Sequence, residues 1–148
     1  MDCDDFDDQV EQLEFRLFEL ELRKFASACP EGIERTLIKI VADSAERSVD
    51  FAGLTQRLKA DAERQDGLIA YYVLDGIAYY AKNSDSLGDF GNKLEKCVNF
   101  LDSEGDPKGD YTPIMRRIWK GVAKIGTRAA YDAVMRQNLF TSLSSFSP

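Results

Sequence analysis

One acidic side chain interrupts an apolar and aromatic run, and its position suggests ligand binding. The run is YYVLDGIAYYAKN at 71–83, and the acid is Asp75. A carboxylate buried without a partner is costly, so Asp75 needs a hydrogen-bond donor, either from a neighbouring helix or from a bound molecule. At about 100° per residue, three further side chains share its helix face: Tyr72, Tyr79 and Lys82. This face is a candidate ligand-binding surface, and the opposite, apolar face is predicted to pack.

The composition argues against catalysis. Histidine is absent from the 148 residues, which removes the commonest general base, histidine-activated nucleophiles and imidazole metal ligands. Pairs of carboxylates have little diagnostic value here, because 26 residues are Asp or Glu. We therefore expect a protein that is not an enzyme.

Two acidic segments invite comparison with a calcium-binding loop. They carry Asp2, Asp4, Asp5, Asp7 and Asp8 at the start of the chain, and Asp102, Glu104 and Asp106 later. The first segment lacks the required spacing and glycine, and in the second Pro107 takes the position of the turn glycine. No phosphate-binding G-x-x-x-x-G-K-[ST] string occurs. We expect neither a metal nor a cofactor.

Charge and length narrow the class of protein further. The formal net charge is -7 and 44% of the residues are apolar, which fits one compact domain and argues against general nucleic-acid binding. Charged residues interrupt every long apolar run, so no membrane span is expected. Three cysteines without a C-x-x-C pair indicate reduced thiols and an intracellular protein.

Apolar periodicity predicts a succession of helices. The predicted helices cover 6–25, 33–45, 49–62, 70–82 and 90–101. Asp50 is a candidate N-cap of the third helix and Asp89 of the fifth. Strand signals are almost absent, so the chain is predicted to be all-α.

The last third of the chain is predicted to form a loop and two helices. The loop covers 102–113, and Pro113 suits the first turn of a helix that contains Trp119 as a core residue. Gly126-Thr127 is predicted to end this helix and to precede another with an apolar face of Ala130, Tyr131, Val134 and Met135. The domain is expected to cover 1–140, with 141–148 a flexible tail or an artificial chain end.

Three segments resemble the family of CTD-interacting domains. They are 33–58 (IERTLIKIVADSAERSVDFAGLTQRL), 71–83, and RRIWKG at 116–121. These domains grip the phosphorylated C-terminal tail of the largest RNA polymerase II subunit, and within the family the chain looks closest to the N-terminal domains of pre-mRNA cleavage and termination factors. The resemblance implies a right-handed superhelical array of about seven or eight helices, similar to ENTH and VHS domains.

The resemblance implies a peptide-binding set on the helix that carries the acid. Tyr72 and Asp75 match the groove tyrosine and the peptide-binding aspartate of the family, and Tyr79 lies on the same face. The serine that follows the aspartate is Gly76 here, and the Lys-Asn pair of the family is matched at Lys82 only after a shift of nearly one turn. Two further tyrosines, Tyr71 and Tyr80, are predicted to pack.

A late basic cluster is a candidate phosphate-binding site. It consists of Arg116, Arg117, Lys120, Lys124 and Arg128, and the first three are the predicted phosphate ligands. Family members that read a serine phosphate strongly carry an arginine where this chain has Ile114, and the acidic Glu31 also opposes such a site. A solvated helix face explains the same cluster equally simply.

The function implied by the resemblance is recognition of the phosphorylated polymerase II tail, in the nucleus. Such binding couples transcription to mRNA 3' end processing or termination, and other processing proteins are further candidate partners. Two alternatives remain open. One is a membrane-traffic adaptor of the ENTH or VHS type, and the other is an acidic inhibitor or immunity-type protein with a basic partner.

Overall fold

The computed structural model of the chain is entirely helical over the residues that it describes. It describes the backbone of residues 3–106, 109 and 111–145, and the side chains of 8–106, 109 and 111–139. No strand occurs in these ranges, which confirms the all-α prediction. Six helices follow one another: α1 (Cys3–Ala28), α2 (Ile33–Arg47), α3 (Phe51–Glu63), α4 (Leu68–Lys82), α5 (Leu87–Glu104) and α6 (Pro113–Ser145).

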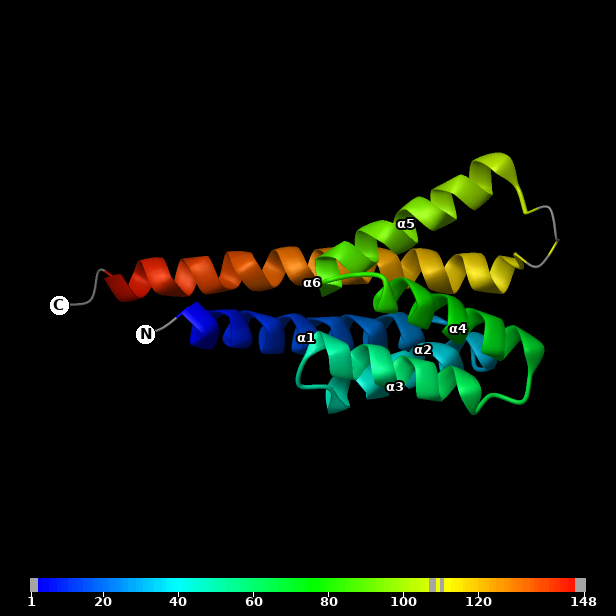
Figure 1. The fold of residues 1–148 in the computed structure, drawn as a ribbon, viewed down its shortest axis with the longest axis horizontal. Helices are drawn as coiled ribbons and strands as arrows, with labels where there is room; N and C mark the ends of the chain where they lie inside the picture. The colour runs from blue at the N-terminus through cyan, green and yellow to red at the C-terminus, as the bar shows by residue number, and fades with distance from the viewer. Residues whose placement is uncertain (1–2, 107–108, 110, 146–148) are drawn as a thin grey trace.

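Consecutive helices pack as antiparallel pairs. The most extensive contacts join α5 to α6, α1 to α2, and α3 to α4. The long helix α6 then returns along α1, so that the start of α1 and the end of α6 lie side by side (Figure 1). In this arrangement α4 lies between α3 on one side and the α5–α6 pair on the other, which determines what its exposed face meets.

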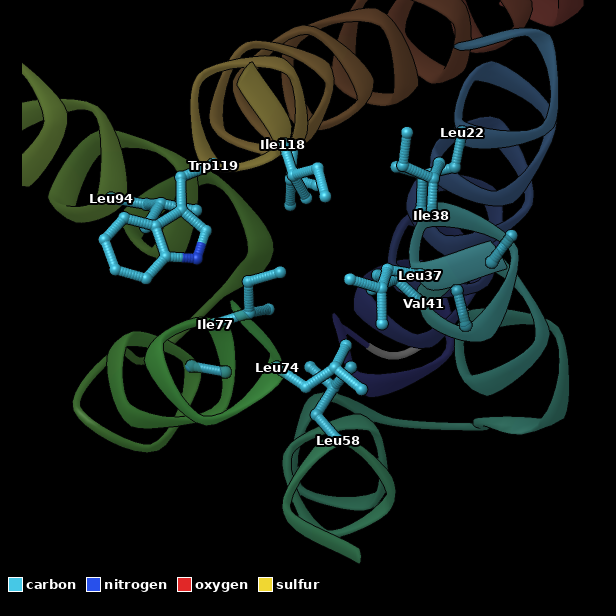
Figure 2. Close-up of a cluster of buried hydrophobic side chains, with 14 of the residues drawn as sticks. Leu22, Leu37, Ile38, Val41, Leu58, Leu74, Ile77, Leu94, Ile118 and Trp119 are labelled. Atoms are coloured by element: carbon cyan, nitrogen blue, oxygen red, sulfur yellow. The ribbon is translucent and has the colours of Figure 1, made fainter. Parts of the chain in front are cut away.

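The core receives side chains from all six helices (Figure 2). Leu22, Leu37, Leu58, Leu74, Leu94 and Ile118, one from each helix, are at most 1% exposed. Each such side chain contributes about 1.5–3 kcal/mol relative to leaving it in water. Trp119 is 7% exposed and its Nε1 donates a hydrogen bond of 3.0 Å to the carbonyl of Val73, which confirms its prediction as a core residue.

The two predicted helix caps have different outcomes. Asp50 is the N-cap of α3, and its carboxylate accepts a hydrogen bond of 2.7 Å from the Gly53 amide, as predicted. The cap of α5 is Ser86 instead of Asp89, because the helix starts earlier than its apolar pattern indicated. Asp89 lies in the first turn, where its carboxylate accepts from the amide of Asp85.

The expected break at Gly126-Thr127 was wrong, because α6 runs through both residues. Gly126 is buried against α5, where a Cβ on it would lie 3.6 Å from the Cα of Gly91. The Thr127 hydroxyl donates to the carbonyl of Ala123, one turn earlier. A Cβ on Gly126 would make only ordinary van der Waals contacts, so the approach of α5 to α6 does not depend on this glycine. The described residues contain six helices instead of seven or eight.

The end of α6 also differs from the expected pattern. Ala129 and Ala133 face the core, whereas Tyr131, Val134 and Met135 are exposed at 65%, 44% and 49%. The helix continues to Ser145, so most of the expected tail is helical and residues 146–148 lie outside the described residues.

The cysteine side chains that the structure describes are free thiols. Cys29 is buried and Cys97 is half-buried against the core. Burial raises the pKa of the Cys29 thiol above its usual value. The side chain of Cys3 lies outside the described residues.

Candidate functional site

A groove between α3 and α4 contains the Asp75 side chain. It consists of two hollows of about 530 and 180 Å³, which adjoin because Thr55, Lys59 and Lys82 line both. We call it the α3–α4 groove. Its other lining residues are Phe51, Ala52, Gln56, Asp75, Ala78, Tyr79, Ala81, Ser84 and Asp85.

Helix periodicity explains why α4 presents polar groups to this groove. Leu74 and Ile77 are fully buried and hold the apolar face of α4 against the core. The face that carries Asp75, Tyr79 and Lys82 is thereby turned outward. The structure thus brings together three of the five predicted peptide-binding residues.

The opposite wall comes from α3 and was missed in the sequence. Leu54 and Leu58 are fully buried, and each is followed by a groove residue, Thr55 or Lys59. The Thr55 hydroxyl donates to the carbonyl of Phe51, and the residue lines both hollows. Nothing in the sequence distinguishes these residues from an ordinary solvated helix face.

Asp75 is exposed and has no hydrogen bond or ion pair with any residue that the structure describes. Among the described side chains and backbone groups of α3, α5 and α6, none supplies the arginine, tyrosine or backbone donor that a structural carboxylate would need. Its oxygens are consequently available to hydrogen-bond donors from a bound molecule.

An aromatic side chain lines the same hollow as this carboxylate. Tyr79 is 59% exposed, and its ring meets that of Tyr80 edge to face, with centroids 5.1 Å apart. Tyr80 is partly buried against the core, as predicted. This burial raises the pKa of its phenol, and the contact with the Cys97 thiol raises it further. The packed ring supports the exposed one, which offers a preformed apolar surface inside the groove.

The groove carries balanced charges in an acidic protein. Lys59 and Lys82 are exposed and form no ion pair within the described part of the chain. Asp75 and Asp85 supply two negative charges, so the formal charge of the lining is zero, against -7 for the whole chain. An anionic ligand therefore meets less repulsion here than at an average point of the surface.

Two predicted peptide-binding residues lie outside the lining of the groove. Tyr72 is 40% exposed and its ring contacts that of Tyr71, which is 37% exposed. Gly76 faces α6, where a Cβ would overlap the indole of Trp119. Both residues belong to α4, which forms one wall of the groove, but neither lines the two hollows.

The first two residues of the predicted phosphate site form ion pairs. Arg116 donates from Nε and Nη2 to the carboxylate of Asp102, at 2.8 and 3.2 Å, and this guanidinium holds the pKa of Asp102 below its usual value. Arg117 donates from Nε to both oxygens of Glu34 on α2, at 3.1 and 3.3 Å. Both guanidinium groups thus already have an anionic partner.

The third residue of that predicted site lies elsewhere. Lys120 and Lys124 line a small hollow of about 70 Å³ with Glu95. Neither lysine lines the α3–α4 groove. The structure therefore does not join the basic cluster to the groove that contains Asp75.

A membrane-spanning helix and a cluster of three or more metal ligands are both absent from the described ranges. No helix there is both long and apolar enough to cross a bilayer, and no group of three or more Cys, Asp or Glu side chains is arranged to hold a metal ion.

None of the protein-family models, curated proteins or solved structures with which the chain was compared matches it.

Proposed function

We propose that this chain is a non-catalytic recognition domain whose α3–α4 groove binds an extended peptide segment. The observation that carries the proposal is Asp75, an exposed carboxylate without a partner among the described residues, in a hollow beside the exposed ring of Tyr79. The carboxylate accepts a backbone N–H of the segment, and the ring packs against a proline or aromatic side chain. A few polar groups in a mainly apolar groove orient a ligand that otherwise binds through shape.

The partner that best fits the sequence is the phosphorylated C-terminal tail of RNA polymerase II. The support is the resemblance of 33–58, 71–83 and 116–121 to CTD-interacting domains, together with the exposure of Tyr72 and Asp75 on α4. On this proposal the domain acts in the nucleus, in mRNA 3' end processing or transcription termination, beside other processing proteins. Its helices would follow the right-handed superhelical path of that family.

The expected affinity for one short segment is modest. A flexible tail loses conformational freedom when it binds, which offsets much of the contact energy, so a Kd in the micromolar range or weaker is expected. Repeated segments along one tail raise the apparent affinity, because a second repeat is held near the groove at high effective concentration.

Titration with a labelled peptide of two phosphorylated heptad repeats tests this proposal. Asp75→Asn keeps the shape of the side chain but removes its charge, and is expected to weaken binding about tenfold, equivalent to about 1.4 kcal/mol. The matched control is Asp66→Asn, because Asp66 is exposed in the α3–α4 connection and lines neither hollow. Its affinity should equal that of the wild type.

Two results would contradict the proposal in different ways. Equal binding by Asp75→Asn and the wild type would remove Asp75 from the site. No measurable binding of the tail peptide by the wild type, up to millimolar concentration, would remove the polymerase tail as the partner.

A further inference from the structure

Two lysines on opposite walls of the α3–α4 groove line the same two hollows. Lys59 comes from α3 and Lys82 from the last turn of α4. Both line the hollow that contains Asp75, and yet neither lies within ion-pair distance of its carboxylate. A cation suits the C-terminus of any helix, so Lys82 alone would need no explanation. Lys59 lies before the last turn of α3, so this preference does not account for its position.

Some other basic side chains in this protein already bind carboxylates. Arg23, for example, binds Glu19, Asp43 and Glu46 at 2.6–3.0 Å. Two unpaired ammonium groups that share a hollow repel each other unless an anion lies between them. In the hollow that contains Asp75, the two ammonium groups outnumber the one carboxylate, so an added anion is attracted there.

We propose that Lys59 and Lys82 bind the phosphoryl group of a phosphoserine or phosphothreonine in the segment that occupies the α3–α4 groove. This inference rests on the proposed function and identifies the part of the groove that reads phosphorylation. A phosphoryl group carries a charge of about -1.5 to -2 at pH 7, which two ammonium groups balance.

The arginines near the start of α6 are the alternative phosphate ligands, and their contacts disfavour that role. To bind a phosphate, Arg116 has to release or share its two hydrogen bonds to Asp102, and Arg117 those to Glu34. The groove lysines have no such contact to release within the described chain. They also lie in the hollow that holds Asp75, which the arginines do not line.

The arrangement also orients the segment along the groove. Asp75 repels a phosphoryl group, so it takes the backbone N–H of the segment, and the phosphoryl group lies where the two hollows meet. Thr55 lines both hollows together with the two lysines, and its position at the junction marks the expected place of the phosphorylated residue.

Two charge-matched double variants test the assignment. Lys59→Gln/Lys82→Gln and Arg116→Gln/Arg117→Gln each remove two positive charges, so both change the long-range field equally. Each is titrated with a heptad-repeat peptide in phosphorylated and unphosphorylated form. The wild type and the arginine variant are expected to prefer the phosphorylated peptide about tenfold. The lysine variant should lose that preference and bind the phosphorylated and unphosphorylated peptides with equal affinity.

The opposite pattern overturns the inference and leaves the proposed function intact. One such result is that the wild type binds both peptides with equal affinity. The other is that the arginine variant loses the preference for the phosphorylated peptide and the lysine variant keeps it. If neither tail peptide binds, the proposed function fails. A short glycine-flanked phosphoserine peptide is then titrated and followed by NMR at the lysine side chains. Shifts at Lys59 and Lys82 that are absent with the serine peptide support the phosphate site, and unchanged spectra overturn it.

Discussion

Gly76 of α4 lies against the indole of Trp119 on α6. A methyl group on Gly76 would overlap Cζ2 of this ring and come within 3.0 Å of Cε2. The hydrogen bond from the indole Nε1 to the carbonyl of Val73 prevents the ring from moving away without loss. The serine that CTD-interacting domains carry after their aspartate therefore has no room here, and the glycine is a packing requirement.

Gly76→Ala is expected to lower the free energy of unfolding by about 1–3 kcal/mol, because the added methyl group overpacks the α4–α6 contact. Urea denaturation measures the change. Gly126→Ala is the matched control, since a Cβ there meets only atoms at 3.6–3.8 Å. Alanine is the better helix former, so this control should be neutral or more stable by up to about 1 kcal/mol. Equal stability of the two variants would show that the indole has room for a side chain.

Ser44→Ala should destabilise the contact between α2 and α3. The Ser44 hydroxyl donates to Oδ2 of Asp61, and both residues are buried, at 5% and 8% exposure. Arg64 satisfies only Oδ1, at 2.5 Å, so the variant leaves a buried carboxylate oxygen without its donor and costs about 1–3 kcal/mol. Thermal unfolding tests this prediction against Ser103→Ala, an exposed helical serine on α5. Identical melting temperatures for the two variants would argue against it.

Glu14 is expected to make the protein less stable as the pH rises through neutrality. Burial, with a smaller contribution from the nearby Glu11 carboxylate, raises the pKa of Glu14 from its usual 4.5 to about 7. The folded state thus binds the proton more tightly than the unfolded chain does. The contribution of Glu14 to stability is greatest below pH 4.5 and declines as the pH rises to about 7.

Glu14→Gln mimics the protonated side chain and should remove this pH dependence. At pH 8 the variant is expected to be more stable than the wild type by roughly 1–2 kcal/mol, after allowance for solvent screening of a half-buried group. Urea unfolding at intervals from pH 5 to pH 8 measures the difference. Glu63→Gln, at an exposed position on α3, is the control for the loss of one surface carboxylate. A wild-type profile retained by Glu14→Gln would contradict the assignment.

Asp75→Asn is expected to leave the stability of the domain unchanged within about 0.5 kcal/mol, because the side chain is exposed and bonds to no described residue. A carboxylate with a structural role would cost more than 1 kcal/mol when it is changed. Thermal unfolding of the variant therefore separates the ligand role from the structural alternative, independently of any peptide. A clear fall in melting temperature would favour the structural alternative.

Periodicity and local capping were enough to predict most of the helices. The apolar positions of 70–82 correctly placed Leu74 and Ile77 in the core and turned Asp75 and Tyr79 outward. The Asp50 cap was equally predictable from the sequence, because it depends on a side chain and an amide only three residues apart. Such features are local, so the sequence alone determined them.

Only the tertiary structure decided what stands opposite that outward face. Lys59 and Thr55 face Asp75 because α3 packs beside α4, and Arg117 lies at Glu34 because α6 returns past α2. The same holds for Gly126, which resembles a helix stop in sequence and lies inside α6, buried against α5, in the fold. The physical reason is that periodicity fixes the direction of a side chain about its own helix axis, whereas its neighbour is chosen by the packing of distant segments.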